Sequence, residues 1–118
     1  KSGAYLVIEV TEALTVIDVN TGKAEFHNNK EKTFEKINLE AALEISKQLR
    51  IRNISGIIIV DFINMSKKES YQNLEDILKS YVDCDYVKCN IWGMTHLGLM
   101  EISRQKKEKP LNEIVGDK

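Results

Sequence analysis

Two aspartates lie in segments that are otherwise rich in β-branched residues. Asp18 stands within TVIDVN, residues 15–20, and Asp61 directly follows IIIV, residues 57–60. A carboxylate at the edge of so apolar a segment loses hydration unless it is paired with, or bound to, a cation. If the two aspartates come from neighbouring strands, their oxygens can share one hard cation that keeps several waters. This is how Mg²⁺ is usually bound in phosphate chemistry.

An asparagine accompanies the first of these aspartates. Asn20 lies two residues after Asp18, so both side chains project from the same face of a strand. An aspartate at a strand end more often caps a helix or pairs with lysine than it binds a metal. No Lys or Arg is close to either aspartate within its own strand, which weakens the structural alternative without removing it. Spacing alone leaves both interpretations open.

Other charged residues are weaker candidates. Glu9 and Glu12 flank the turn after the first strand and could support a metal ligand, although exposed turn glutamates are ordinary. Basic residues near the end of the chain could hold the phosphates of a nucleic acid, and they are equally explained as a solvated tail. They are Arg104, Lys106 and Lys107.

Histidines and aromatic residues complete the candidates. His27 and His96 lack the carboxylate or nucleophile spacing of an acid-base pair, so neither is assigned to catalysis. Trp92 and Tyr86 could stack a nucleic-acid base, but an aromatic residue in a strand more often belongs to the core.

Length and composition limit the class of protein. The 118 residues fit one globular domain, and no stretch approaches the roughly 20 apolar residues that a membrane-spanning helix needs. The formal net charge of -1 argues against binding nucleic acid by bulk electrostatics. Cys84 and Cys89 suit neither a disulfide framework nor a four-ligand zinc site, so reduced thiols in the cytoplasm are expected. The start at Lys1, without Met, is typical of a fragment.

Hydrophobic periodicity predicts an α/β fold with one mixed sheet of about five strands and two main helices packed on it. Strands are expected at residues 5–10, 14–20, 57–60, 87–91 and 99–104, in the order strand, strand, helix, strand, helix, strand, strand. The run 57–60 is typical of a central strand covered on both faces. Residues 23–36 are expected to form a loop and residues 105–118 a charged tail. Helices are expected from a cap at Asn38 to Gly56, and from a capping box at Ser66 to Val82.

Three segments resemble the ribonuclease E/G family. They are GAYLVIEVTEALTVIDVNTG, NLEAALEISKQLRIRNISGIIIVDFINM and LGLMEISRQK, and in this order they cover most of the chain. The resemblance implies that residues 1–118 are a single DNase I-like catalytic subdomain of a larger ribonuclease. In that family two aspartates coordinate the catalytic Mg²⁺ while a nearby asparagine orients one of them, which carries over to Asp18, Asp61 and Asn20.

The resemblance also implies an activity. It is Mg²⁺-dependent hydrolysis of single-stranded RNA, leaving a 5'-phosphate and a 3'-hydroxyl, with Mn²⁺ as a conceivable substitute metal. This chain departs from the family pattern at DFINM, where DFIDM is common, so Asn64 stands at the second acidic position and a carboxylate supporting the metal ligands is in doubt. The cysteines of the family's zinc-linked dimerisation segment would follow this domain, so no zinc is expected here. The parent is expected to be a homo-oligomer that includes further domains.

Two alternative functions are compatible with parts of the sequence. A receiver-like signalling domain also has an aspartate after a hydrophobic strand, but it needs an early acidic pair and a late lysine, and this chain has IDVN and no such lysine. A non-catalytic RNA-binding or scaffolding module would tolerate the loss of either aspartate. Because positioning of the substrate supplies much of an enzyme's rate, this piece alone is expected to cleave RNA weakly or not at all.

Overall fold

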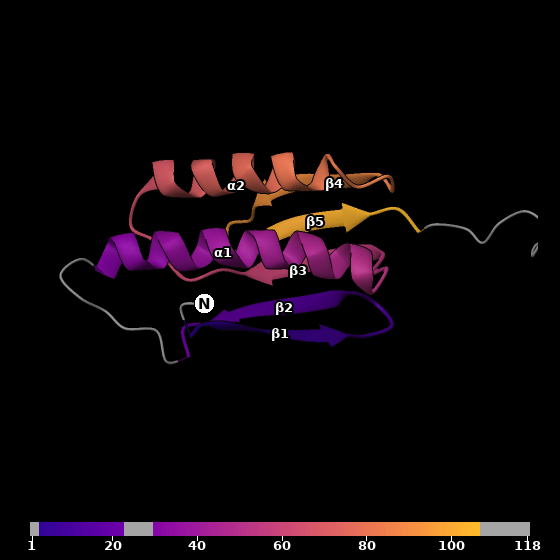
Figure 1. Ribbon diagram of the computed structural model, residues 1–118, viewed down its shortest axis with the longest axis horizontal. Coiled ribbons are helices and arrows are strands. Elements are labelled where there is room, and N and C mark those ends of the chain that lie inside the picture. The colour runs from indigo at the N-terminus through magenta and orange to yellow at the C-terminus, as the bar shows by residue number, and fades with distance from the viewer. Residues whose placement is uncertain (1–2, 23–29, 107–118) are drawn as a thin grey trace, which may run out of the picture.

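A five-stranded sheet and two helices form two layers (Figure 1). The computed structural model describes residues 3–22 and 30–106. The elements in chain order are β1 (Tyr5–Val10), β2 (Thr15–Asn20), α1 (Lys30–Ile51), β3 (Gly56–Asp61), α2 (Lys68–Val82), β4 (Cys89–Met94) and β5 (Met100–Arg104). The predicted mixed sheet, its five strands and its two helices are confirmed. No helix in these two ranges is long and apolar enough to span a membrane.

The strand order explains how distant segments meet. In space the strands follow the order β1-β2-β3-β5-β4. Strands β2 and β3 are parallel, as a connection through the crossover helix α1 requires, and the other neighbouring pairs are antiparallel. Both parallel strands therefore end at the same end of the sheet, where α2 also begins (Figure 1). The β4–β5 turn lies at this end too.

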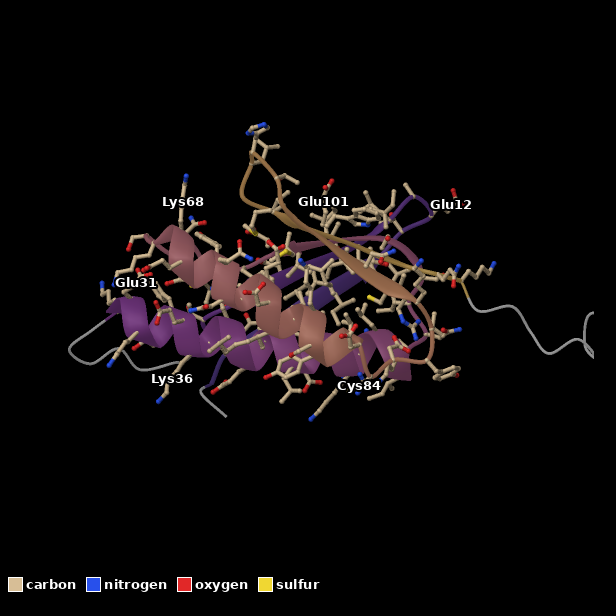
Figure 2. All side chains as sticks on the ribbon, turned by 90° about the horizontal axis from the view of Figure 1, so that it is seen from above. Glu12, Glu31, Lys36, Lys68, Cys84 and Glu101 are labelled. Atoms are coloured by element: carbon tan, nitrogen blue, oxygen red, sulfur yellow. The ribbon has the colours of Figure 1, made fainter. Side chains whose placement is uncertain are left out.

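Both described helices cover the same face of the sheet, which holds the core. Side chains alternate along each strand, so Ile17, Ile58 and Val60 are fully buried against the helices. The opposite face, which we call the open face, includes Asp18 and Asn20 on β2, Ile57, Ile59 and Asp61 on β3, and Glu101 and Ser103 on β5. Figure 2 shows Glu101 pointing away from the helices. The expectation that residues 57–60 are covered on both faces is wrong for this chain, since Ile57 is 53% exposed.

Helix α1 begins earlier than expected. Residues 30–36, predicted as part of a loop, are helical, while residues 23–29 lie outside the described part. This charged segment contributes to a short apolar helix face, because Phe34 and Ile37 are three residues apart and pack on the core. Asn38 is therefore inside the helix and is not its cap. It is fully buried, and its amide bonds both the N–H and the C=O of Ile63, at 3.0 and 2.9 Å.

Helix α2 does not use the predicted capping box. Its first residue is Lys68, and no side chain caps its N-terminus. The hydroxyl of Ser66 instead donates to Glu31 of α1 at 3.0 Å, and the backbone N–H of Ser66 donates to the same carboxylate at 3.1 Å. Figure 2 shows Glu31 and the start of α2 at the same end of the molecule. The side chain predicted to cap α2 is thus bonded to a residue 35 positions away instead of to its own helix.

Strand β4 is also displaced from its expected position. It runs from Cys89 to Met94 and so includes Gly93, which lies beyond the strand expected at residues 87–91. A register shift between Ile91 and Gly93 marks a β-bulge against β5. Gly93 has a φ of +112°, which only glycine adopts readily. The bulge therefore accounts for the glycine within this strand.

An internal ion pair fastens the end of the sheet where β3 begins. Arg104 donates through Nε to Oδ2 of Asp85 at 2.7 Å, and through one terminal nitrogen to Asn53 and to the carbonyl of Ile54, each at 3.0 Å. The side chains of the ion pair are each 2% exposed. Burial raises the pKa of Asp85, but the hydrogen bonds and charge of Arg104, with the N–H of Val87, outweigh it and lower the pKa overall.

Replacement of Arg104 should destabilise the fold strongly. Removing one partner leaves a buried, unpaired charge, so Arg104→Ala should lower the free energy of unfolding by about 3–5 kcal/mol in urea titrations at pH 7. Arg104→Lys keeps the charge but not the forked geometry and should cost less. Because the folded-state pKa of Asp85 is lowered, its contribution exists above its ordinary pKa of 3.8 and is lost as the pH falls through the folded-state value. Exposed Lys106→Ala is the control, and equal stabilities for the Arg104 and Lys106 variants would contradict this role.

The two cysteines should differ in reactivity. Both are free thiols, with Cys84 exposed and Cys89 partly buried. Burial, with the nearby charge of Asp85, raises the pKa of Cys89 from 9.0 to about 11, so about a hundredfold less thiolate is present at pH 8. In a time course with N-ethylmaleimide followed by peptide mass spectrometry, Cys84 should be labelled at least about tenfold faster. Equal labelling rates in the folded protein would refute this difference.

Candidate functional site

The parallel pairing of β2 and β3 places the two candidate aspartates side by side. Asp18 and Asp61 are Cα partners in the register of this pair, and neighbouring strands are about 4.8 Å apart. Both side chains are exposed, and both project from the open face, because the residues before them, Ile17 and Val60, are fully buried on the other face. Two carboxylates therefore meet at the end of the sheet where β2 and β3 finish.

The two negative charges of the aspartate pair repel each other. Burial and, secondarily, the negative charge of Asp18 raise the pKa of Asp61 above its ordinary value of 3.8. No ion pair of either aspartate with a Lys or Arg is found in the part of the chain that the structure describes. A structural salt bridge therefore does not explain why two acids stand here. A shared cation would remove the repulsion.

Asn20 follows Asp18 on the same face. Its amide oxygen accepts a hydrogen bond from the N–H of Gly22 at 2.8 Å, in the turn that ends β2. This bond uses one of the two lone pairs of the oxygen, and the amide nitrogen offers two N–H donors. An N–H donor suits a carboxylate or phosphate oxygen and does not suit a cation. The amide nitrogen thus suits the orienting role expected of Asn20 from the sequence.

The two residues predicted to support the metal ligands are placed differently. Glu12 lies in the β1–β2 turn, at the opposite end of the sheet from the aspartates, as Figure 2 shows. A contact of Glu12 with the pair does not fit this geometry. Asn64 is exposed in the segment after β3, three residues from Asp61. Asn64 thus stays a candidate.

A third acid on the open face was not singled out from the sequence. Glu101 on β5 is exposed and pairs with Ile59, so it is a diagonal neighbour of Asp61, at about 7–8 Å between Cα atoms. The alternation of Met100, Glu101 and Ile102 was the available signal, since it places Glu101 opposite the core. Within residues 3–22 and 30–106, no three His, Cys, Asp or Glu side chains are grouped to hold a metal ion. A cation here would have the two aspartates as its carboxylate ligands.

The predicted basic contacts lie away from the pair. Arg104 is 3% exposed and is engaged by Asp85, so an RNA contact does not fit its position. Lys106 is exposed but follows β5, which ends at the opposite end of the sheet from Asp61. Lys107 lies outside the described residues. Lys67 and Lys68, at the start of α2, are exposed basic residues at the aspartate end instead, as Figure 2 shows for Lys68.

The histidines and aromatics have definite places as well. His27 lies outside the described residues, and His96 is exposed on the β4–β5 turn, at the aspartate end of the sheet. Tyr86 is 79% exposed before β4, at the other end. Trp92 is 65% exposed on β4 and is not part of the core.

The paired carboxylates are ligands of the type that Mg²⁺ takes. Mg²⁺ prefers oxygen ligands, retains several waters, and is commonly held by one or two carboxylates together with substrate phosphates. In the described part of the chain no group of three His, Cys, Asp or Glu side chains could hold a metal ion, so two exposed carboxylates match that preference better than they match zinc. The class of protein defined by fold and site is therefore an α/β domain with a paired-aspartate site suited to phosphate chemistry.

Comparison with known proteins identifies the family. Residues 1–107 match the model of the ribonuclease E/G family. The chain is 42% identical over 117 residues to "Ribonuclease G" of Haemophilus influenzae and 44% identical over 117 residues to "Ribonuclease E" of Nostoc. These matches cover 99% and 98% of this chain but 24% and 17% of the relatives, so the chain spans at most about a quarter of their length. The chain belongs to the ribonuclease E/G family.

Removal of one of the two negative charges should raise the free energy of unfolding. With its pKa raised, Asp61 binds a proton more tightly in the folded than in the unfolded state, so the free energy of unfolding falls as the pH rises from 3.8 through the folded-state pKa. Asp18→Asn should therefore raise the free energy of unfolding at pH 7 in EDTA by up to about 1 kcal/mol, and the gain should shrink toward pH 4. Glu12→Gln is the control in the same thermal denaturation series. A loss of stability in Asp18→Asn at pH 7 would contradict the repulsion.

Proposed function

We propose that this chain is the magnesium-binding catalytic subdomain of an endoribonuclease that hydrolyses phosphodiester bonds in single-stranded RNA. The products are a 5'-phosphate and a 3'-hydroxyl. The observation that carries the proposal is the side-by-side placement of Asp18 and Asp61 on the open face. Membership of the ribonuclease E/G family supports the substrate class.

Each residue of the site has a role that follows from its position. Asp18 and Asp61 would hold Mg²⁺, which when bound polarises a phosphate and lowers the pKa of its own water. The amide nitrogen of Asn20 can donate to one of these carboxylates and fix its orientation. Lys67 and Lys68 offer positive charge for RNA phosphates at the same end of the sheet. The reaction requires no nucleophilic side chain.

The wider proposal concerns the protein that contains these residues. It acts in RNA processing and decay in the cytoplasm, as a homo-oligomer, and Mn²⁺ can replace Mg²⁺. Its remaining parts position the RNA, so the 118-residue chain alone cleaves weakly. This agrees with the small share of the relatives' length that the chain covers.

Loss of either aspartate should abolish cleavage. In the full-length protein, Asp18→Asn and Asp61→Asn should each lower kcat for a single-stranded RNA about a hundredfold or more, because each removes a metal ligand. Circular dichroism verifies that the variants fold. Cleavage is measured by gel electrophoresis of end-labelled RNA in Mg²⁺, in Mn²⁺ and in EDTA.

Glu12→Gln serves as the matched control, since it removes an exposed acid at the other end of the sheet. It should cleave like the wild type. If both aspartate variants also cleave at the wild-type rate, the catalytic assignment is lost. If these variants still bind RNA and no form of the protein cleaves it, a non-catalytic RNA-binding module is the better description.

A further inference from the structure

The single tryptophan of the chain is exposed on the sheet. Trp92 lies on β4 and is 65% exposed. Its indole N–H donates to the hydroxyl of Ser103 on β5 at 2.7 Å. Because this bond satisfies the polar atom of the ring, the exposed part is almost entirely apolar π surface. So large an exposed ring on a strand is not explained by packing within the described part of the chain.

Local backbone geometry holds the ring in place. Trp92 stands between Ile91 and Gly93, where the register between β4 and β5 shifts. A β-bulge of this kind redirects a side chain and is common near functional sites. Its neighbours Ile91 and Gly93 are buried. The bulge and the Ser103 bond together orient the indole, so a ligand that stacks on it meets a ring with little freedom left to lose.

Trp92 and the aspartates share one surface. Ser103 is on the open face, as are Asp18 and Asp61, and the bonded ring lies on the same side. Two strand spacings, roughly 10 Å, separate β4 from β3 across β5. Trp92 is level with Ile58 and Ile59 of β3. Measured along the strands, it is therefore two to three residues, or roughly 8 Å, from the level of Asp61. A single strand with stacked bases, at about 3.4 Å per nucleotide, spans such a separation with about three to four nucleotides.

The negative charge near Trp92 limits which part of an RNA ligand can bind to this residue. Glu101 lies between Trp92 and Asp61 on the open face, so phosphates are repelled there. An unpaired base is uncharged and has a flat π surface that stacks on an aromatic ring. The apolar ring therefore favours a base where the neighbouring Glu101 disfavours the phosphate backbone.

We propose that Trp92 stacks on an unpaired base of the RNA a few nucleotides from the scissile phosphate and so positions the strand across the open face. This inference deepens the proposed function and rests on it. Trp92 is a substrate-binding residue and takes no part in proton transfer or metal binding.

Because Trp92 is the only tryptophan, the intrinsic fluorescence of the 118-residue chain reports on this ring alone. Titration with a ten-nucleotide oligoadenylate in Mg²⁺ should quench that fluorescence, whereas a blunt RNA duplex should quench it much less. In the full-length protein, Trp92→Ala should raise KM for single-stranded RNA about tenfold or more with little change in kcat. Trp92→Phe keeps a stacking ring and should restore most of the affinity.

Tyr86→Ala is the matched control, because it removes an exposed aromatic residue at the opposite end of the sheet, and its KM should equal that of the wild type. An unchanged KM in Trp92→Ala, or no quenching by millimolar oligoadenylate, overturns the inference. A lower melting temperature of full-length Trp92→Ala with unchanged KM would mean that the ring packs against another part of the protein, which also overturns it. The proposed function is judged separately, by the loss of kcat in Asp18→Asn.

Discussion

The pairing of two parallel strands determines both the stability and the chemistry of this domain. The register between β2 and β3 sets Ile17 beside Val60 on one face and Asp18 beside Asp61 on the other. Since successive side chains alternate, a slip of either strand by one residue would expose its member of the first pair and bury its aspartate. The hydrophobic core therefore enforces the close approach of two like charges. The site needs no separate scaffold, because the packing of the core already fixes it.

The sequence predicted the strands and helices well where their signals were local. The alternation in residues 5–10 and the apolar stripe of the second helix need only neighbours along the chain, and both elements were placed correctly. The errors concern residues whose partners are distant. Asn38 and Ser66 have the side chains of helix caps, yet they bond Ile63 and Glu31, 25 and 35 positions away. No local rule weighs such a partner against a cap.

The site was predictable to the same extent. The residue types and the apolar surroundings of Asp18 and Asp61 indicated a shared cation, but whether the two strands are neighbours is a matter of topology. The structural role of Arg104 was missed because a charged side chain is expected at the surface of a protein. In the structure, its hydrogen bond to Asp85, 19 residues away, stabilises it in a buried position. The exposure of Trp92 could not be predicted either. The sequence does not reveal that both described helices cover the same face of the sheet and leave the face of Trp92 open.

The buried amide of Asn38 has a consequence for how the domain meets its ligand. It clamps both backbone polar groups of Ile63, two residues beyond Asp61, while Phe62 and Met65 are anchored in the interior. The segment that leaves the reactive end is thus rigid before any ligand arrives. Under the proposed function, capture of an ion there would require rotation of carboxylate groups and no refolding of the main chain, so the entropy lost on binding would be small. Helix α1, on the far side of the sheet, thereby fixes the backbone beside the aspartate pair.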